Sequence, residues 1–229
     1  MASVDWQKTN VPTLAKKRSH FDNEKRAISN HSNKDINRDS TNQNYYLNCE
    51  DWNDVLKKSR EFIKEIDKKH QPKKKVKEDD RVNMVSLNKP CPRVITEMGK
   101  SEEFFEITNK LLESIFIGYM GMHIHLDEVH DYLDPKTNTI VTSCEHGHAW
   151  VGAYAEWEDK KGNLRQGING KNFETKANIL KLNKAMNEMC LEHFGIPYNT
   201  GDEPRNKSVE ELKKESYKAV KKELVKTCK

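Results

Sequence analysis

The residues with the clearest chemical potential are histidines. Most of the nine lie in two short runs, residues 121–130 (GMHIHLDEVH) and residues 144–150 (CEHGHAW), and each run contains a His-x-His pair. In an extended strand, residues two apart project from the same face, so each pair can direct two imidazoles at one point. Two such strands side by side would gather several imidazoles around a divalent cation. Imidazole alone suits zinc, manganese, iron, copper or nickel, so the pattern predicts a metal site without naming the metal.

Cysteine usage and the N-terminal sequence indicate where the chain works. The five cysteines include no Cys-x-x-Cys pair, and Cys144, beside the second histidine pair, is interpreted as a packing residue rather than a ligand. No apolar segment near the N-terminus suggests a secretory signal, and no run approaches the ~20 apolar residues that span a bilayer. We therefore expect free thiols and a cytoplasmic protein without a membrane segment.

A polar segment with chemical groups of its own precedes the histidine runs. Residues 20–48 are rich in Asn, Asp, Ser and His, have no hydrophobic period, and contain His20, Arg26 and the pair Tyr45-Tyr46. Such a composition favours turns and side-chain-to-backbone hydrogen bonds. From the residues alone, two interpretations stay open: a disordered segment, or an active-site loop.

Hydrophobic periodicity predicts the elements that must position these residues. Helices are expected over residues 50–70, 101–117 and 171–195, and strands over residues 82–88, 118–126, 139–142 and 146–157. Residues 11–14 are expected to form a short first strand or an ordered arm, and residues 209–229 a charged helix. Because no βαβ pattern occurs, the predicted fold class is α+β, an antiparallel sheet with helices packed on one face.

Basic residues gather in blocks although the formal net charge is only +4. The blocks lie at residues 16–18, 57–58, 68–69 and 73–77. Such blocks can bind the phosphate backbone of a nucleic acid, and each can equally be a solvated helix face or a linker.

Three motifs occur in order along the chain. The first combines His20 and Arg26 with His31-Ser-Asn-Lys-Asp-Ile-Asn37, Thr41 and Asn44-Tyr45. The second is Ile124-His-Leu-Asp-Glu128 followed by His146-Gly-His148, and a weaker third spans Gly162-Asn-Leu164, Lys171-Asn-Phe173 and Phe194-Gly195. Together they resemble the MobV-type relaxases, the Pre/Mob plasmid mobilisation and recombination proteins. The resemblance covers residues 5–205, so we expect a relaxase-like catalytic domain over residues 1–205 and a charged helical tail over residues 206–229.

The resemblance implies a fold and a metal site. It implies an HUH endonuclease with a five-stranded antiparallel sheet, which nicks one DNA strand at an origin of transfer and stays joined to the 5′ phosphate. By the same resemblance, His125, His146 and His148 ligate manganese or magnesium, and Asp127 and Glu128 orient the imidazoles. Three imidazoles agree better with manganese.

The resemblance also implies a nucleophile and a partner. His20 is the expected nucleophile and Arg26 is expected to neutralise phosphate charge, with Tyr45, and also Tyr46, as competing nucleophiles. The partner would be single-stranded or cruciform origin DNA, and the protein could form a homodimer. The expected DNA contacts are His31, Asn33, Lys34, Lys73, Lys74 and Lys75.

Two departures from the family pattern leave alternatives open. The gap from His20 to Arg26 is longer than the usual His-x-x-Arg, and Asn23 stands at the ungapped position. A long polar segment separates Glu128 from His146, and Glu145 replaces the usual proline, so His130 is an alternative ligand to His146. Family members usually carry a further C-terminal region, so the chain is expected to be either a minimal or a truncated catalytic domain.

Two other functions compete with the nicking activity. One is an origin-binding or replication-initiator protein of a plasmid or phage, which would use the same fold with little or no cleavage. The other is a metal-dependent hydrolase unrelated to DNA, which the basic blocks and the Asn-rich segment disfavour.

Overall fold

The centre of the protein is a five-stranded antiparallel sheet with strand order β1-β3-β7-β4-β2. The computed structural model describes residues 4–29, 36–70, 81–129, 131–134 and 139–198. The strands of the sheet are β1 (Asp5–Thr9), β2 (Tyr45–Leu47), β3 (Met84–Pro90), β4 (Tyr119–His125) and β7 (His146–Gly152). This arrangement confirms the expected α+β class and the antiparallel sheet.

The register between β4 and β7 brings the two histidine pairs together. His125 lies opposite His146, and His123 lies opposite His148. A register shift between Tyr119 and Gly121 precedes these pairs, and Gly121 has φ 130°. A Cβ atom at Gly121 would lie 2.5 Å from Cys49 Sγ and 2.8 Å from the Leu47 carbonyl oxygen. Glycine is therefore required at this irregularity, which sets the register of the histidines.

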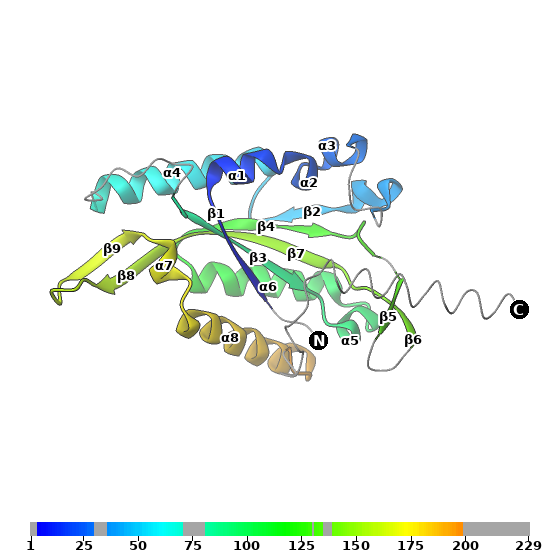
Figure 1. Cartoon of the computed structure of the whole chain (residues 1–229). Coiled ribbons are helices and arrows are strands. Elements are labelled where there is room, and N and C mark those ends of the chain that lie inside the picture. Colours follow the sequence, from blue (N-terminus) through cyan, green and yellow to red (C-terminus); the bar gives the residue numbers. More distant parts are fainter. Residues whose placement is uncertain (1–3, 30–35, 71–80, 130, 135–138, 199–229) are drawn as a thin grey trace, which may run out of the picture.

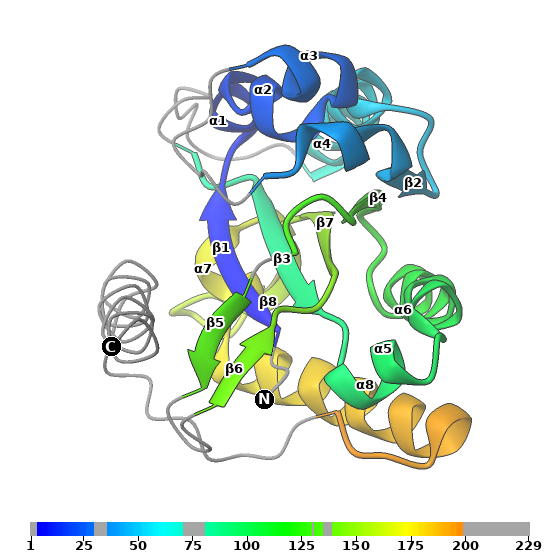
Figure 2. The same ribbon diagram turned by 90° about the vertical axis from the view of Figure 1, so that its right-hand side faces the viewer.

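Helices lie on both faces of the sheet, whereas only one covered face was expected (Figures 1 and 2). The helices α5 (Arg93–Glu97), α6 (Ser101–Ile115) and α8 (Lys176–Phe194) lie on one side. The helices on the other side are α1 (Val11–Lys16), α2 (Arg18–Phe21), α3 (Asn23–Ile28) and α4 (Trp52–His70), the last of which was predicted.

The first three helices were missed because they are too short for hydrophobic periodicity to show. Side-chain caps define the starts of two of them instead: Asn10 accepts a hydrogen bond from the Thr13 amide at α1, and Asp22 accepts one from the Lys25 amide at α3. Residues 11–14 are therefore helical, and the first strand lies just before them. A 3₁₀ helix (Arg38–Gln43) continues the polar segment, so its described part is ordered structure rather than a disordered chain.

An aromatic layer packs between the sheet and the helices α2 and α4. Trp150 on β7 contacts Trp52 and Phe21, with ring centroids 4.9 Å and 5.0 Å away. Phe21 also contacts His148, with centroids 5.2 Å apart. Burying rings of this size contributes several kcal/mol of hydrophobic stabilisation, so Phe21 fixes the end of α2 against the histidine face.

Two hairpins extend from the sheet, and several predicted boundaries change. The hairpins are formed by β5 (Asp131–Asp134) with β6 (Thr139–Thr142), which was predicted, and by β8 (Tyr154–Glu158) with β9 (Leu164–Ile168).

The strand expected over residues 146–157 is divided at Ala153. The helix expected over 171–195 is divided into α7 (Gly170–Phe173) and α8, because Thr175 caps α8 by accepting from the Asn178 amide.

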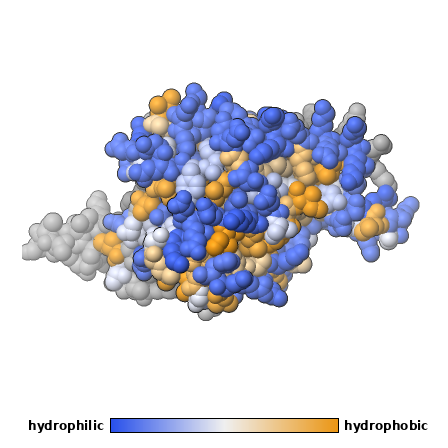
Figure 3. Space-filling model, turned by 180° about the vertical axis from the view of Figure 1, so that it is seen from behind, coloured by the Kyte–Doolittle hydropathy of each residue, from blue (hydrophilic) through white to orange (hydrophobic). Residues whose placement is uncertain are grey.

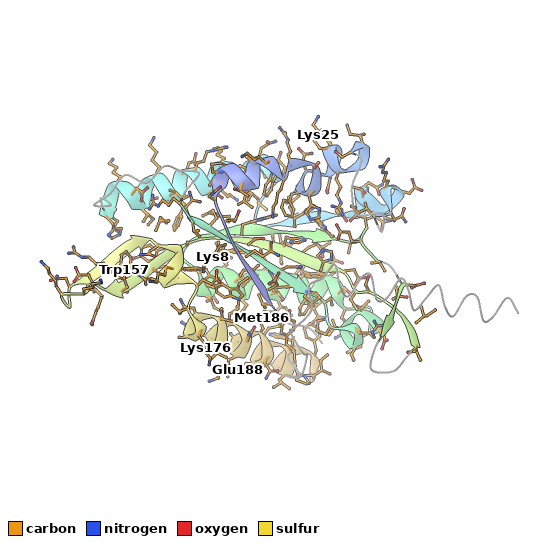
Figure 4. The ribbon with its side chains drawn as sticks, in the orientation of Figure 1. Lys8, Lys25, Trp157, Lys176, Met186 and Glu188 are labelled. Carbon is orange, nitrogen blue, oxygen red and sulfur yellow. The ribbon has the colours of Figure 1, made fainter. Side chains whose placement is uncertain are left out.

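The surface is mostly hydrophilic on the face shown in Figure 3, with hydrophobic residues in small groups. Side chains project outward from the helices and from the β8–β9 hairpin, where Trp157 is labelled in Figure 4. Among the described residues, no helix has the length and apolar character needed to cross a membrane. The predicted tail, residues 206–229, lies outside the described residues.

Candidate metal and active site

The three histidines predicted as metal ligands lie together on the face beneath α2 and α3. Ring centroids are 5.1 Å apart for His125 and His146, 4.8 Å for His125 and His148, and 5.0 Å for His146 and His148. Two overlapping groups have donor atoms within 4.8 Å of one another: His20 with His125 and His148, and Glu128 with His125 and His146. The cluster therefore offers imidazoles from two adjacent strands and one carboxylate.

The protonation states of the cluster suit a divalent cation. Burial lowers the pKa of His125 and of His148 well below the usual histidine range, so both rings are neutral and keep a lone pair. His148 Nε2 is buried and, among the described residues, has no hydrogen-bond partner. A buried nitrogen without a partner is unfavourable unless something binds it, so the residues fit a metal ion. This donor set suits manganese better than magnesium, which prefers oxygen ligands.

Glu128 is the carboxylate that contacts the imidazoles. Its oxygens lie 3.3 Å from His125 Nδ1 and 3.6 Å from His146 Nε2. Burial opposes ionisation, but the charge of His146 and a hydrogen bond from Arg26 outweigh it and lower the pKa of Glu128 to about 2. The predicted contact of Glu128 with the imidazoles is present, and its carboxylate is itself close enough to belong to a donor group.

Arg26 and Asp127 form a buried ion pair behind the cluster, and neither lies where the sequence placed it. Both side chains are fully buried, and the guanidinium donates to the two Asp127 oxygens over 2.6 and 2.9 Å. Thr41 Oγ1 also donates to Asp127, over 2.8 Å. The expected contact of Asp127 with an imidazole is not among the hydrogen bonds described, because Arg26 and Thr41 occupy its oxygens. The Arg26 side chain is fully buried, and its described contacts are with Asp127, Glu128 and His20 rather than with the surface.

His20 extends from the end of α2 over the cluster. Its ring lies 4.9 Å from that of His125 and 5.4 Å from that of His148, and its side chain is 34% exposed. Arg26 Nη1 is 3.0 Å from His20 Nδ1 and donates to the His20 carbonyl over 2.9 Å. Burial, with help from the Arg26 charge and against that of Glu128, lowers the pKa of His20 to about 4. The ring is therefore neutral at pH 7.

The long gap between His20 and Arg26 is accommodated by a turn. Asp22 ends α2 and caps α3, so the chain changes direction between the two residues and returns the Arg26 side chain to His20. Asn23, which stands at the ungapped position, faces His123 instead, with its Oδ1 2.9 Å from His123 Nε2.

Comparison with known proteins gives solved structures but no sequence match. No protein-family profile matches the chain, and no curated protein matches it. A MobM relaxase domain (MOBV; Mob_Pre), bound to plasmid pMV158 oriT DNA in a Mn-bound crystal structure at pH 6.8, matches with a TM-score of 0.67. The identity is 20%, and the match covers 93% of this chain and 98% of that one. The chain has the fold of a MOBV relaxase domain.

Two further MobM structures support this assignment of the fold. One, also with oriT DNA and Mn-bound, matches with a TM-score of 0.65 and 19% identity over 93% of this chain and 98% of that chain. Another, with 26-nt pMV158 oriT DNA, matches with a TM-score of 0.53 and 14% identity over 92% and 98%. The resemblance stated from the motifs is thus confirmed as a MOBV relaxase fold that extends over nearly the whole chain.

Within this MOBV fold, the two tyrosines lie on opposite faces of the sheet. Tyr45 is paired with Ile124, so it points away from the histidine face, and burial together with Glu102 and Glu106 of α6 raises its pKa. The structure therefore does not bring Tyr45, the competing nucleophile, to the cluster. Tyr46 lies on the histidine side and stacks on His123, but its hydroxyl donates to the Phe21 carbonyl.

The polar segment before His146 anchors the second histidine strand. Glu145, which stands where the family has proline, accepts hydrogen bonds from Thr96 Oγ1 over 3.0 Å and from Ser101 Oγ over 3.2 Å. Its carbonyl accepts from the Cys91 amide over 2.8 Å. Cys144 is partly buried against the core and belongs to neither donor group found among the described residues, as its interpretation as a packing residue predicted.

Some predicted residues lie outside the described part, and one important residue was not singled out. The predicted site residues outside the described part are His31, Asn33, Lys34, Lys73, Lys74, Lys75 and the alternative ligand His130.

His123 was noted only as half of a His-x-His pair, although it is fully buried and its Nδ1 lies 3.0 Å from His125 Nε2. The alternation of the strand was the signal, since it places His123 on the same face as His125.

Proposed function

We propose that this protein is a relaxase that nicks one DNA strand at an origin of transfer and forms a covalent 5′-phosphate intermediate. The observation that carries this proposal is the position of His20, one-third exposed and neutral, against a cluster of three further histidines and Glu128. A nucleophile directly beside a metal-ligand set is the arrangement that phosphoryl transfer requires.

His125, His146 and His148 would hold a manganese ion, with Glu128 as a neighbouring or additional ligand. When bound, the ion would withdraw charge from the scissile phosphate and fix its position. The chain's own contribution is to keep the imidazoles of His125 and His148 neutral by burial and to fix the spacing of the histidines through the β4–β7 register.

The proton balance at His20 follows from its two neighbours. In the described state Nδ1 accepts from Arg26, so the neutral ring carries its proton on Nε2. Attack through Nε2 requires the proton to move to Nδ1, and Glu128 Oε1, 3.8 Å from Nδ1, is the nearby carboxylate that can then receive it. The Nε2–phosphorus bond forms as the bond from phosphorus to the 3′ oxygen breaks, the imidazole proton passes to Glu128, and the released 3′ oxygen takes a proton from solvent water.

DNA would reach the site along the basic segments. We propose that residues 1–205 form the catalytic domain, that residues 206–229 form a charged tail, and that the protein acts in the cytoplasm. His31, Asn33 and Lys34 would contact DNA, and Lys73–Lys75 would contact its phosphate backbone. A homodimer stays a prediction.

The test is capture and location of the covalent adduct. The purified protein is incubated with Mn²⁺ and oligonucleotides tiling the DNA that flanks its own gene, and adducts are digested and mapped by mass spectrometry. We expect the modified residue to be His20, with no adduct from His20→Ala and unchanged adduct from His193→Ala, an exposed histidine on α8. DNA binding without any adduct would favour the origin-binding function, and an adduct on Tyr45 or Tyr46 would refute the assignment of the nucleophile.

A further inference from the structure

A line of hydrogen bonds, partly buried at Asn23 and fully buried at the two imidazoles, connects the backbone to the histidine cluster. Asn23 Nδ2 donates to the Asn44 carbonyl over 2.9 Å. Asn23 Oδ1 lies 2.9 Å from His123 Nε2, and His123 Nδ1 lies 3.0 Å from His125 Nε2. Both imidazoles are fully buried. The line ends at His125, a predicted metal ligand, and its middle member is His123.

The direction of every hydrogen bond in this line is set at its outer end. A carbonyl can only accept, so Asn23 turns its NH₂ toward Asn44 and its oxygen toward His123. His123 must therefore donate from Nε2. Since a neutral imidazole carries one proton, its Nδ1 is an acceptor, and His125 must donate to it from Nε2.

The same reasoning leaves His125 Nδ1 with an unprotonated lone pair. That atom lies 3.3 Å from Glu128 Oε1, so two acceptors face each other with no proton between them. Arg26 Nη2 already donates to this Glu128 oxygen from its other side, whereas the lone pair of His125 Nδ1 receives no proton and stays available to a cation. We propose that His123, held by Asn23, is a positioning residue that fixes His125 in its Nε2–H form and presents Nδ1 to the metal. This inference rests on the metal site of the proposed function.

The surroundings of His123 prevent the ring from turning. Tyr46 stacks on it with centroids 4.2 Å apart and an interplanar angle of 13°, and the Tyr46 hydroxyl is held by the Phe21 carbonyl.

The partner of a metal-bound histidine is ordinarily a carboxylate, a carbonyl or water. A neutral imidazole in this place draws less on the His125 proton, so His125 donates less charge and the ion stays more electrophilic.

The first test reads the tautomers directly in the metal-free protein. Long-range ¹H–¹⁵N spectra of histidine-labelled protein separate protonated from unprotonated ring nitrogens. We expect His123 and His125 both to be protonated at Nε2. In Asn23→Leu, which contacts no predicted ligand, both rings should become mixtures of tautomers while His193 stays unchanged. A native His125 protonated at Nδ1, or an Asn23→Leu spectrum identical to the native one, would overturn the proposal.

The second test measures Mn²⁺ binding by calorimetry in two substitutions of the same residue. His123→Leu removes the acceptor, and we expect it to weaken Mn²⁺ binding ~10–100-fold. His123→Asn places an oxygen close to the position of Nδ1, and we expect it to restore most of the affinity. Thermal unfolding of both variants identifies a loss of folding, in which case Asn23→Leu supplies the affinity measurement.

Two results separate this inference from the proposed function. If His123→Asn loses as much affinity as His125→Ala, then His123 is itself a ligand and the positioning role is refuted. If the tautomers and affinities are as expected but no DNA adduct forms, the metal site stands and the nicking activity fails. Unchanged Mn²⁺ affinity in both His123 variants, with native folding, would also overturn the positioning role.

Discussion

Replacing Arg26 by methionine is expected to lower the melting temperature of the protein by roughly 6–20 °C. The guanidinium is fully buried and donates to both oxygens of Asp127, to Glu128 and to the backbone of His20. Methionine keeps most of the volume but leaves two carboxylates, one fully buried, without their cation. Removing one partner of a buried pair destabilises by about 3–5 kcal/mol, and in a chain of this length each kcal/mol shifts the melting temperature by about 2–4 °C.

The pH dependence of this loss identifies its cause. The Arg26 hydrogen bonds hold the pKa of Asp127 below its unfolded value despite burial, and the charge of His146 together with Arg26 lowers the pKa of Glu128 to about 2. A depressed carboxyl pKa stabilises the fold above the unfolded pKa, and this stabilisation is lost as the pH falls through the folded value. The difference between the native protein and Arg26→Met should therefore be full at pH 7 and shrink between about pH 5 and pH 2.

The assay is thermal unfolding followed by circular dichroism, with Lys25→Met as the matched control. Lys25 is the neighbouring residue on α3 and its side chain projects outward into solvent (Figure 4). Arg26→Lys should restore little, because one ammonium group cannot replace the several fixed donors of the guanidinium. Melting temperatures of Arg26→Met and Lys25→Met within about 2 °C of each other at pH 7 would refute the reasoning, since the buried pair would then carry no net stability.

Three further predictions concern the metal, the pH profile and DNA. Single alanine substitutions of the predicted ligands should abolish both Mn²⁺ binding in calorimetry and adduct formation with DNA; these variants are His125→Ala, His146→Ala and His148→Ala. Unchanged Mn²⁺ affinity in all three variants would show that the site is wrongly assigned. Because the pKa of His20 is lowered to about 4, the rate of adduct formation should stay constant through the usual histidine pKa near 6.5 and fall only as the pH approaches 4. A pH–rate profile with its midpoint near 6.5 would contradict the neutral, partly buried ring. Replacing Lys73, Lys74 and Lys75 by alanine should weaken DNA binding and flatten its dependence on salt concentration in fluorescence anisotropy, whereas an unaltered slope would make this run a plain linker.

The clustering of the histidine pairs could be predicted from the sequence because a strand has a fixed period of two, whereas the assignment of three of them as metal ligands followed only from the family resemblance and stays a prediction. That period places His146 with His148 on one face, and only an antiparallel pairing was needed to add His125. The fold class followed for a similar reason, since helices such as α4 and α6 are long enough to show their hydrophobic period.

The remainder of the site depends on contacts between residues far apart in the chain. Whether Tyr45 or Tyr46 faces the histidines is decided by the register of β2 against β4, and a shift of one residue would exchange them. The burial of Arg26 depends on a carboxylate about a hundred residues later, which no local pattern reveals. The short helices α1 and α3 are defined by single capping side chains, so boundaries in the polar segment could not be predicted from hydrophobic periodicity.

The β5–β6 hairpin separates the ligands along the chain without separating them in space. The chain leaves the sheet after His125 and returns at His146, and these two residues are directly opposite in the ladder. The distance between the imidazoles is thus set by hydrogen bonding across the strands and is independent of how many residues connect them. Such a connection can lengthen, shorten or acquire new side chains during evolution while the spacing of the two histidine pairs stays constant.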